Sequence, residues 1–247
     1  MSELVGGRRP VAEALASGRA ADRLFVMAAD KPPNPELRAI LAEPRRRGIP
    51  VEQIDSDRLA RMAGFAGHQG VLLRVADRRY SDLAEIVARA EARGEAPFVL
   101  VLDSLQDPVN FGSLLRAAEA AGVHGVVFPE RGAAPLSAAA VKSSAGASEH
   151  LLLARVESLG ATIRELQQRG VLVVAADQDA PATAWESDLT GPMAVVVGAE
   201  GSGISSATRR RCDMLVRFPM VGAVASLNAA TAGALLIFEV VRQRSRA

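Results

Sequence analysis

The sequence predicts an α/β protein with a mostly parallel sheet, preceded by a smaller α/β unit. Three observations support this prediction. After residue 97, short apolar runs alternate with segments of helical spacing, as in repeated βα units. The run from Phe98 to Leu102 is continuously apolar, which is typical of a strand buried on both faces of a parallel sheet. Before this run, residues 77–96 are rich in charge and alanine, and this change of composition separates the two units.

Residues 1–76 are the first predicted unit. Apolar spacing, prolines and glycines indicate helices near 10–15, 35–47 and 57–62 and strands near 24–27, 48–54 and 71–75. We predict residues 77–96 to be a linker. Its segment Asp82 to Arg93 has helical spacing, and we interpret it as a surface helix with few apolar anchors.

Residues 97–247 are the second predicted unit. Further strands are expected near 126–128, 151–156, 171–176, 193–197 and 214–218, with helices between them. Chain connectivity in such folds is almost always unknotted, so physical rules alone predict a doubly wound sheet.

The stretch from Met214 to Glu239 contains the clearest candidate for a ligand site. A short apolar strand ends at Pro219, which lacks a backbone donor. Gly222 permits backbone angles closed to other residues, and Ser226 or Asn228 can cap the long helix that follows. Ligands of open α/β sheets bind at such junctions, beyond the carboxyl ends of the strands.

Composition excludes several classes of protein. A net charge of +1 gives no overall attraction to phosphate, so RNA binding would depend on clusters such as Arg45 to Arg47, Arg78 with Arg79, and Arg209 to Arg211. Each cluster could equally be a solvated surface run. Cys212 is the only cysteine, which excludes an intrachain disulfide and makes a cysteine metal site implausible; we expect no bound metal. No secretory pattern and no membrane-length apolar run is present, so we expect a soluble, cytoplasmic protein.

Common nucleotide-binding and hydrolase motifs are missing. Neither Asn110-x-Gly112 nor the run Gly198 to Gly203 gives the dinucleotide fingerprint after the first strand, and no phosphate-binding loop of the Walker type occurs. The run Gly146 to His150 lacks the second glycine of a serine nucleophile elbow.

Three ordered motifs instead resemble those of the SPOUT class of RNA methyltransferases, in its TrmH branch. They are Asn110-Phe-Gly112 with Arg116 downstream, Gly198-Ala-Glu-Gly-Ser-Gly203, and Phe218-Pro-Met220 followed by Ser226-Leu-Asn228. The length and layout resemble the members that methylate the 2′-hydroxyl of a guanosine in 23S ribosomal RNA. The resemblance extends over the whole chain.

The resemblance implies a fold and partners that periodicity does not show. Residues 97–247 would form a SPOUT domain whose C-terminal segment is tucked through a loop as a deep trefoil knot. Residues 1–76 would form an RNA-binding domain of ribosomal-protein type, with contacts expected at Gly6, Arg8, Arg9 and the loop Gly67 to Gly70. Members of this class are generally homodimers, and Leu235, Leu236 and Phe238 of the last helix would suit the interface or, alternatively, the core.

The resemblance also implies S-adenosylmethionine as cofactor. We expect it against the site residues Gly198, Gly201, Phe218, Met220 and Leu227, largely through their backbone, because glycine-rich loops let the main chain approach a ligand closely. The implied catalytic residues are Asn110, Arg116, Glu200, Ser226 and Asn228. Arg116 could accept the 2′-hydroxyl proton or grip a phosphate, and the second role is chemically simpler because arginine stays protonated. Glu200 could orient Arg116 or accept a bond from the substrate.

Several functions stay open on this basis. Transfer RNA, or a ribosomal RNA methylated for antibiotic resistance, is an alternative substrate. A catalytically silent RNA-binding or ribosome-assembly protein is the alternative outside enzymes. The matching motif residues favour an enzyme.

Overall fold

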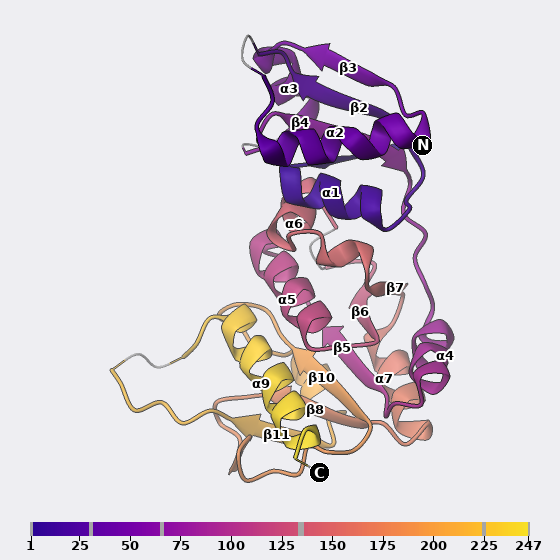
Figure 1. The fold of residues 1–247 in the computed structure, drawn as a ribbon. Coiled ribbons are helices and arrows are strands. Elements are labelled where there is room, and N and C mark those ends of the chain that lie inside the picture. Colours follow the sequence, from indigo (N-terminus) through magenta and orange to yellow (C-terminus); the bar gives the residue numbers. More distant parts are fainter. Residues whose placement is uncertain (1, 30–31, 65–66, 133–135, 224–225, 247) are drawn as a thin grey trace.

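The computed structural model describes residues 2–29, 32–64, 67–132, 136–223 and 226–246. It contains a four-stranded and a seven-stranded sheet, each with its own hydrophobic core. The smaller sheet and its helices lie at one end of the molecule, and the larger α/β unit lies below them in Figure 1. The two units meet where α1 (Arg8–Ala16) lies on α6 (Ala138–Ser143).

The N-terminal sheet has the strand order β1-β4-β2-β3. Its strands are β1 (Ser2–Gly6), β2 (Ala21–Met27), β3 (Val51–Ile54) and β4 (Val71–Ala76), and only β2 and β3 pair in parallel. Helices α1 and α2 (Pro35–Arg47) pack on one face and α3 (Ser56–Ala63) on the other. Strand β1 was not predicted, because five residues at the start of a chain have no preceding turn to mark them.

The segment predicted as a linker contains a helix that packs firmly on the larger unit. Helix α4 (Leu83–Arg93) begins with a capping box between Asp82 and Glu85 and buries Leu83, Ile86, Val87 and Ala90. Leu83 and Ile86 belong to a core cluster of the seven-stranded sheet. Our expectation of a surface helix with few apolar anchors was therefore wrong. The alanines and charged residues of this segment made the apolar face of the helix hard to see in the sequence.

All pairings in the larger sheet are parallel, in the order β7-β6-β5-β10-β8-β11-β9. The strands are β5 (Phe98–Leu102), β6 (Gly125–Pro129), β7 (Leu152–Val156), β8 (Leu172–Ala176), β9 (Ala182–Thr183), β10 (Met193–Val197) and β11 (Met214–Arg217). The remaining helices are α5 (Pro108–Ala120), α6, the 3-10 turn η1 (Ala147–Glu149), α7 (Leu159–Gln168), α8 (Ser206–Arg209) and α9 (Ala229–Arg244).

Helices cover both faces of this sheet. Alternate side chains of β5 point to opposite faces, so Phe98, Leu100 and Leu102 join the core under α5 and α9, whereas Val99 and Val101 join the core under α4 and α7. This explains the continuous apolar run that identified β5 in the sequence. The predicted α/β class with a mostly parallel sheet is confirmed. The trefoil knot stays a prediction, and none of the described helices is long and apolar enough to cross a membrane.

Candidate cofactor pocket and polar cluster

A cavity of about 480 Å³ lies beyond the carboxyl ends of β8, β10 and β11. Its lining includes seven of the predicted site residues, namely Gly198, Glu200, Gly201, Phe218, Met220, Ser226 and Leu227. Apolar groups from Val197, Ile204 and Val216 line the same space. The volume of the cavity lies in the range of small-molecule sites, and ligands of parallel sheets commonly bind at the carboxyl ends of the strands.

One wall of the cavity is a tight loop from Gly198 to Ile204. Ala199 and Gly203 exchange backbone hydrogen bonds of 2.9 Å in each direction, and Gly201 and Gly203 have φ angles of +78° and +65°, which favour glycine. A Cβ on Gly198 would overlap the backbone of Gly203 and Ile204. The lack of a side chain at Gly198 is therefore required by the fold of the loop itself.

Asp103, which follows β5, fixes the far end of this loop. Its side chain is buried and accepts a hydrogen bond of 2.8 Å from the backbone N–H of Ser205. Ser104 Oγ donates to the other carboxylate oxygen at 3.1 Å. The sequence analysis missed Asp103, although its place directly after a buried strand was the available signal.

The opposite wall comes from the segment between β11 and α9, part of which extends away from the body in Figure 1. Phe218, Met220, Ser226 and Leu227 line the cavity from this side. Gly222 does not adopt a positive φ, so the left-handed conformations that a glycine permits are not used at this turn. Residues 224–225 of the proposed motif segment lie outside the described residues.

Asn110, Glu200 and Asn228 form a polar cluster at the rim of the cavity. Asn110 Nδ2 donates to Glu200 Oε2 at 3.0 Å. Asn228 Nδ2 donates to Asn110 Oδ1 at 3.1 Å and to Glu200 Oε1 at 3.0 Å. Three of the predicted catalytic residues, far apart in the sequence, thus contact one another. Asn110 is buried, whereas Glu200 and Asn228 are exposed and accessible to a substrate.

Two helix N-termini converge on this cluster. Asp107 caps α5 by accepting from the backbone N–H groups of Val109 and Asn110, which places Asn110 in the first turn. Asn228 caps α9 by accepting from Ala230 and Thr231, so the cap left open between Ser226 and Asn228 belongs to Asn228. The positive ends of both helix dipoles therefore face the Glu200 carboxylate and favour negative charge there.

Arg116 makes no hydrogen bond or ion pair with this cluster among the described residues. It is six residues beyond Asn110 on α5, or about 9 Å along the helix axis, and its side chain is exposed and does not line the cavity. No hydrogen bond or ion pair joins Arg116 to Glu200 among the described residues, so the expected orienting role of Glu200 has no support here.

The arginine clusters of the sequence are mostly engaged within the chain. Arg47 donates to the carbonyls of Leu15 and Arg19, and Arg78 pairs with Glu149. Arg209 pairs with Asp177 at 3.1 Å, and both line the cavity. Sequence reasoning missed this pair and the adjoining Gln178 and Asp179, although residues 177–179 follow directly on strand β8.

The predicted RNA-contact residues of the first unit share one region. Arg8 donates from its backbone to Gln69 Oε1 at 2.9 Å and from Nε to the Gln69 carbonyl at 3.3 Å, which holds the Gly67 to Gly70 loop against the start of α1. Arg9 is exposed. Gly6 is buried as the last residue of β1.

Cys212 takes no part in this site. Burial raises the pKa of its thiol to about 12, with a smaller contribution from Asp213, so the thiol stays protonated near neutral pH.

Comparisons with known proteins match both units. The SpoU rRNA methylase family model matches residues 97–238, and the model for RNA 2′-O ribose methyltransferase substrate binding matches residues 4–81. The 23S rRNA (guanosine-2′-O-)-methyltransferase RlmB of Yersinia pestis is 41% identical over 84% of this chain and 84% of its own length. RlmB of Photorhabdus laumondii is 43% identical over 80% of this chain and 81% of its own.

Solved structures agree with these matches. The SpoU methyltransferase AviRb from Streptomyces viridochromogenes, in complex with AdoMet, superposes with a TM-score of 0.82 at 28% identity, and the match covers 100% of this chain and 92% of that one.

Proposed function

The chain belongs to the SpoU rRNA methylase family, and from this premise we propose that it methylates the 2′-hydroxyl of a guanosine in 23S ribosomal RNA with S-adenosylmethionine as methyl donor. The resemblance stated from the sequence motifs is thereby confirmed at the level of the family. The main structural support is the joining of Asn110, Glu200 and Asn228 at the rim of a cavity of cofactor size. The ribosomal substrate is proposed because the RlmB relatives match both units of the chain.

The cavity suits S-adenosylmethionine on structural grounds. Gly198 and Gly201 line the cavity without side chains, so their peptide groups can face the polar parts of a ligand, and Val197, Ile204 and Phe218 offer apolar contact. Met220 and Leu227 would cover the ligand from the other wall. When bound, the sulfonium supplies a reactive methyl group, so the protein needs chiefly to align the acceptor hydroxyl.

We assign that alignment to the polar cluster. Glu200 and Asn228 are exposed, and their hydrogen-bonding groups are held in place by Asn110. A ribose hydroxyl entering here would find carboxylate and amide groups that are already oriented, which reduces the entropic cost of alignment. Ser226 lines the cavity and provides a further hydroxyl next to the cluster.

For Arg116 we propose the role of a phosphate anchor. Its exposed side chain lies on the helix that begins at the cluster, outside the cavity. A guanidinium at this place can grip the RNA backbone with two parallel hydrogen bonds. It is also permanently charged, which suits binding of phosphate better than accepting a proton.

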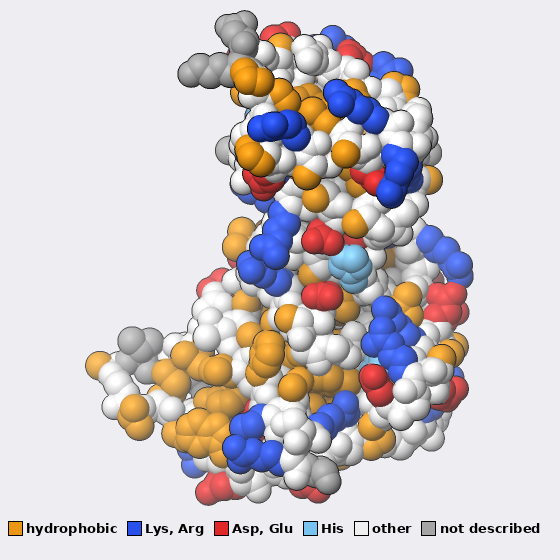
Figure 2. Space-filling view, viewed as in Figure 1, with side chains coloured by type: hydrophobic (Ala, Val, Ile, Leu, Met, Phe, Trp, Pro, Cys, Tyr) orange, Lys and Arg blue, Asp and Glu red, His pale blue; other side chains and the backbone are white. Residues whose placement is uncertain are grey.

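We further propose that the enzyme is a homodimer. Trp185, Met220, Val221, Leu235 and Phe238 are exposed apolar side chains that line one shallow depression beside the cavity. Figure 2 shows hydrophobic side chains gathered over this lower part of the molecule. Leu236 is buried in the core, whereas Leu235 and Phe238 are exposed. Apolar residues of α9 are thus available both to the core and to the proposed dimer interface. Exposed apolar patches of this kind mark interfaces.

The test is methylation of 23S ribosomal RNA by the purified protein. We expect transfer of a labelled methyl group to one guanosine ribose, located by mass spectrometry, and loss of the same 2′-O-methyl group from cells in which the gene is deleted. Asn110→Ala should abolish transfer. Methylation of transfer RNA and not of 23S ribosomal RNA would show that transfer RNA is the substrate. Calorimetric absence of S-adenosylmethionine binding would instead favour the catalytically silent RNA-binding protein.

A further inference from the structure

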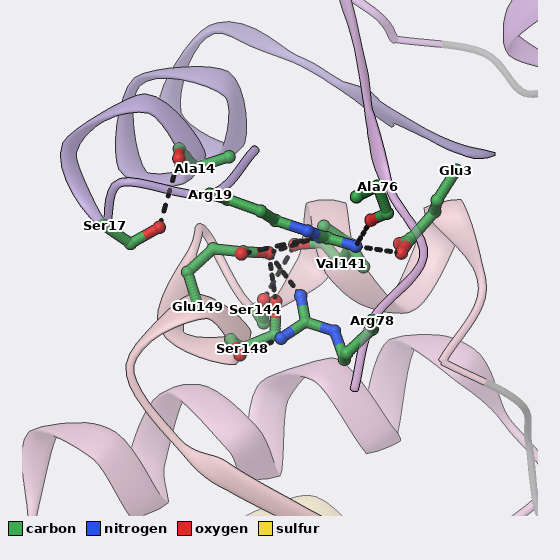
Figure 3. A network of polar contacts seen from close by, with 10 residues as sticks. All are labelled: Glu3, Ala14, Ser17, Arg19, Ala76, Arg78, Val141, Ser144, Ser148 and Glu149. Carbon is green, nitrogen blue, oxygen red and sulfur yellow. Dashed lines mark hydrogen bonds and ion pairs between the residues drawn. The ribbon is translucent and has the colours of Figure 1, made fainter. Parts of the chain in front are cut away.

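A buried ion-pair network joins the two units of the molecule, with Glu149 at its centre (Figure 3). Arg19 of the first unit lies 3.2 and 3.4 Å from the two carboxylate oxygens of Glu149. Arg78, from the segment between the units, pairs with the same carboxylate and donates to the Ser148 carbonyl at 2.7 Å. Arg19 also pairs with Glu3 and donates to the Ala76 carbonyl at 3.0 Å.

The charges of this network depend on one another because they are largely removed from water. The exposed fractions of the side chains are 3% for Glu149, 11% for Arg19 and 12% for Arg78. The Glu149 carboxylate thus lies between two buried guanidinium groups, and Glu3 pairs with Arg19 alone of these two. Removal of the Glu149 charge is strongly unfavourable, because it leaves the buried Arg78 without this carboxylate and leaves Arg19 with Glu3.

Neighbouring contacts hold the same two surfaces together. Val141 of α6 is 1% exposed and belongs to the core cluster of the first unit, although it comes from the second. Glu13 of α1 pairs with His150 at 3.0 Å, and a Cβ on Gly146 would overlap the Glu13 side chain. The interface is therefore fitted and partly apolar, and a flexible tether alone would not produce it.

A chain of contacts connects the predicted RNA-binding loop to the Asn110 cluster through α6. Lys142 Nζ occupies the position that a Cβ on Gly67 would take, so the Gly67 to Gly70 loop contacts α6. Ser143, the next residue, donates from Oγ to the Val109 carbonyl at 2.9 Å, and Asn110 follows Val109. The loop is thus connected to the polar cluster through one short helix.

We propose that Glu149 is a positioning residue, which fixes the substrate-binding unit on α6 so that one RNA contacts the Gly67 to Gly70 loop and the Asn110 cluster at the same time. This inference rests on the proposed function, because it assumes that the partner is RNA. Two binding surfaces held at a fixed separation act at a high effective concentration toward one ligand. If the units separate, the fraction of molecules able to bind with both surfaces falls, and the apparent affinity falls with it.

The test compares Glu149→Gln with the matched control Glu157→Gln in the full-length protein. Glu157 is an exposed glutamate of the same unit, so both variants lose one negative charge. We expect Glu149→Gln to raise KM for 23S ribosomal RNA by about ten- to a hundredfold, with kcat and the Kd for S-adenosylmethionine unchanged. Its radius of gyration in small-angle X-ray scattering should increase. The control should match the parent in every measurement.

Arg19→Met provides the second variant, in case Glu149→Gln does not fold. It leaves the pair between Glu149 and Arg78 intact and removes the contacts of Arg19 with Glu149, Glu3 and the Ala76 carbonyl. Parental scattering and parental KM in the folded variants would overturn the inference, as would a loss confined to kcat. Scattering and RNA-binding titrations need no turnover, so they test the inference even if the parent does not methylate RNA. Failure of the parent to methylate RNA would count against the proposed function only.

Discussion

At the scale of single residues, Gly198 is the glycine of the Gly198 to Ile204 loop at which an added Cβ would overlap the backbone of the loop. Any side chain there would displace the backbone of Gly203 and Ile204 and so deform one wall of the cavity. We expect Gly198→Val to lose measurable S-adenosylmethionine binding in calorimetry while its circular dichroism spectrum stays native. Gly191→Val is the control, because no atom lies within 4 Å of a Cβ at Gly191. Parental affinity in the Gly198 variant would remove this loop from the cofactor site.

Variants of Arg116 can distinguish phosphate binding from acceptance of the 2′-hydroxyl proton. If it grips a phosphate, Arg116→Lys should keep part of the activity and Arg116→Ala should lose about a hundredfold or more in single-turnover rate. The single-turnover rate should then depend on pH in the same way in the parent and in Arg116→Lys, with no midpoint that belongs to residue 116. Arg164→Ala, which removes an exposed helical arginine that does not line the cavity, is the control. A midpoint that shifts in Arg116→Lys would support proton transfer, and an unchanged rate in Arg116→Ala would exclude both roles.

At the scale of elements, His124 anchors the first strand of the large sheet. Its buried ring accepts from the Phe98 N–H through Nδ1 at 3.0 Å, and Nε2 contacts Glu95 at 2.9 Å. Burial lowers the pKa of His124 below its ordinary 6.5, although Glu95 opposes this shift. The folded protein thus binds this proton less readily than the unfolded chain, so the stabilisation is complete above pH 6.5 and is lost as the pH falls toward the folded pKa.

We therefore expect the melting temperature of the parent to fall between pH 6.5 and pH 5, and His124→Asn to reduce that fall. Asparagine can keep the acceptor for Phe98 N–H but cannot take up a proton in this range. Thermal unfolding followed by circular dichroism across this range measures the difference. Parallel curves for the two proteins would show that another group controls the pH dependence.

The apolar face of α9 is the second feature at this scale. Leu235 and Phe238 are 45% and 46% exposed beside Trp185 and Met220. In the proposed dimer this face is buried, so Leu235→Glu with Phe238→Glu should weaken dimerisation at least about thirtyfold. Sedimentation velocity measures the effect. Val51→Glu, at an apolar residue of β3 that is 40% exposed, is the matched control. A stable dimer in the double variant would show that the interface does not include this face of α9.

At the scale of the whole molecule, the cavity belongs to the second unit alone, since all of its lining residues lie between Ala176 and Ala232. Removal of Met1 to Arg79 should therefore leave a folded protein that binds S-adenosylmethionine but has lost most of its RNA affinity. Its melting temperature should fall by a few degrees, because Val141 becomes exposed. Calorimetry and RNA titration measure both properties. Undiminished methylation of 23S ribosomal RNA would contradict the proposed role of residues 1–76.

The sequence by itself determined most strands and helices of the second unit and the place of the candidate site along the chain. The apolar run of β5 predicted a strand buried on both faces. Pro219 predicted a strand end, and Ser226 or Asn228 predicted the cap of the next helix, around a ligand site. These features depend on neighbouring residues and on periodicity, which a single sequence displays. The motif resemblance supplied the family and the residues to examine, since no physical pattern relates Asn110 to Glu200.

The tertiary structure decided which distant groups meet. It placed Asn110 against Glu200 and Asn228, left Arg116 outside the cavity, and drew Arg78 and Glu149 into one buried network. It also showed that α4 belongs to the core of the larger unit. Contacts of this kind depend on how sheets and helices are stacked, and residues separated by a hundred positions carry no local signal of their pairing.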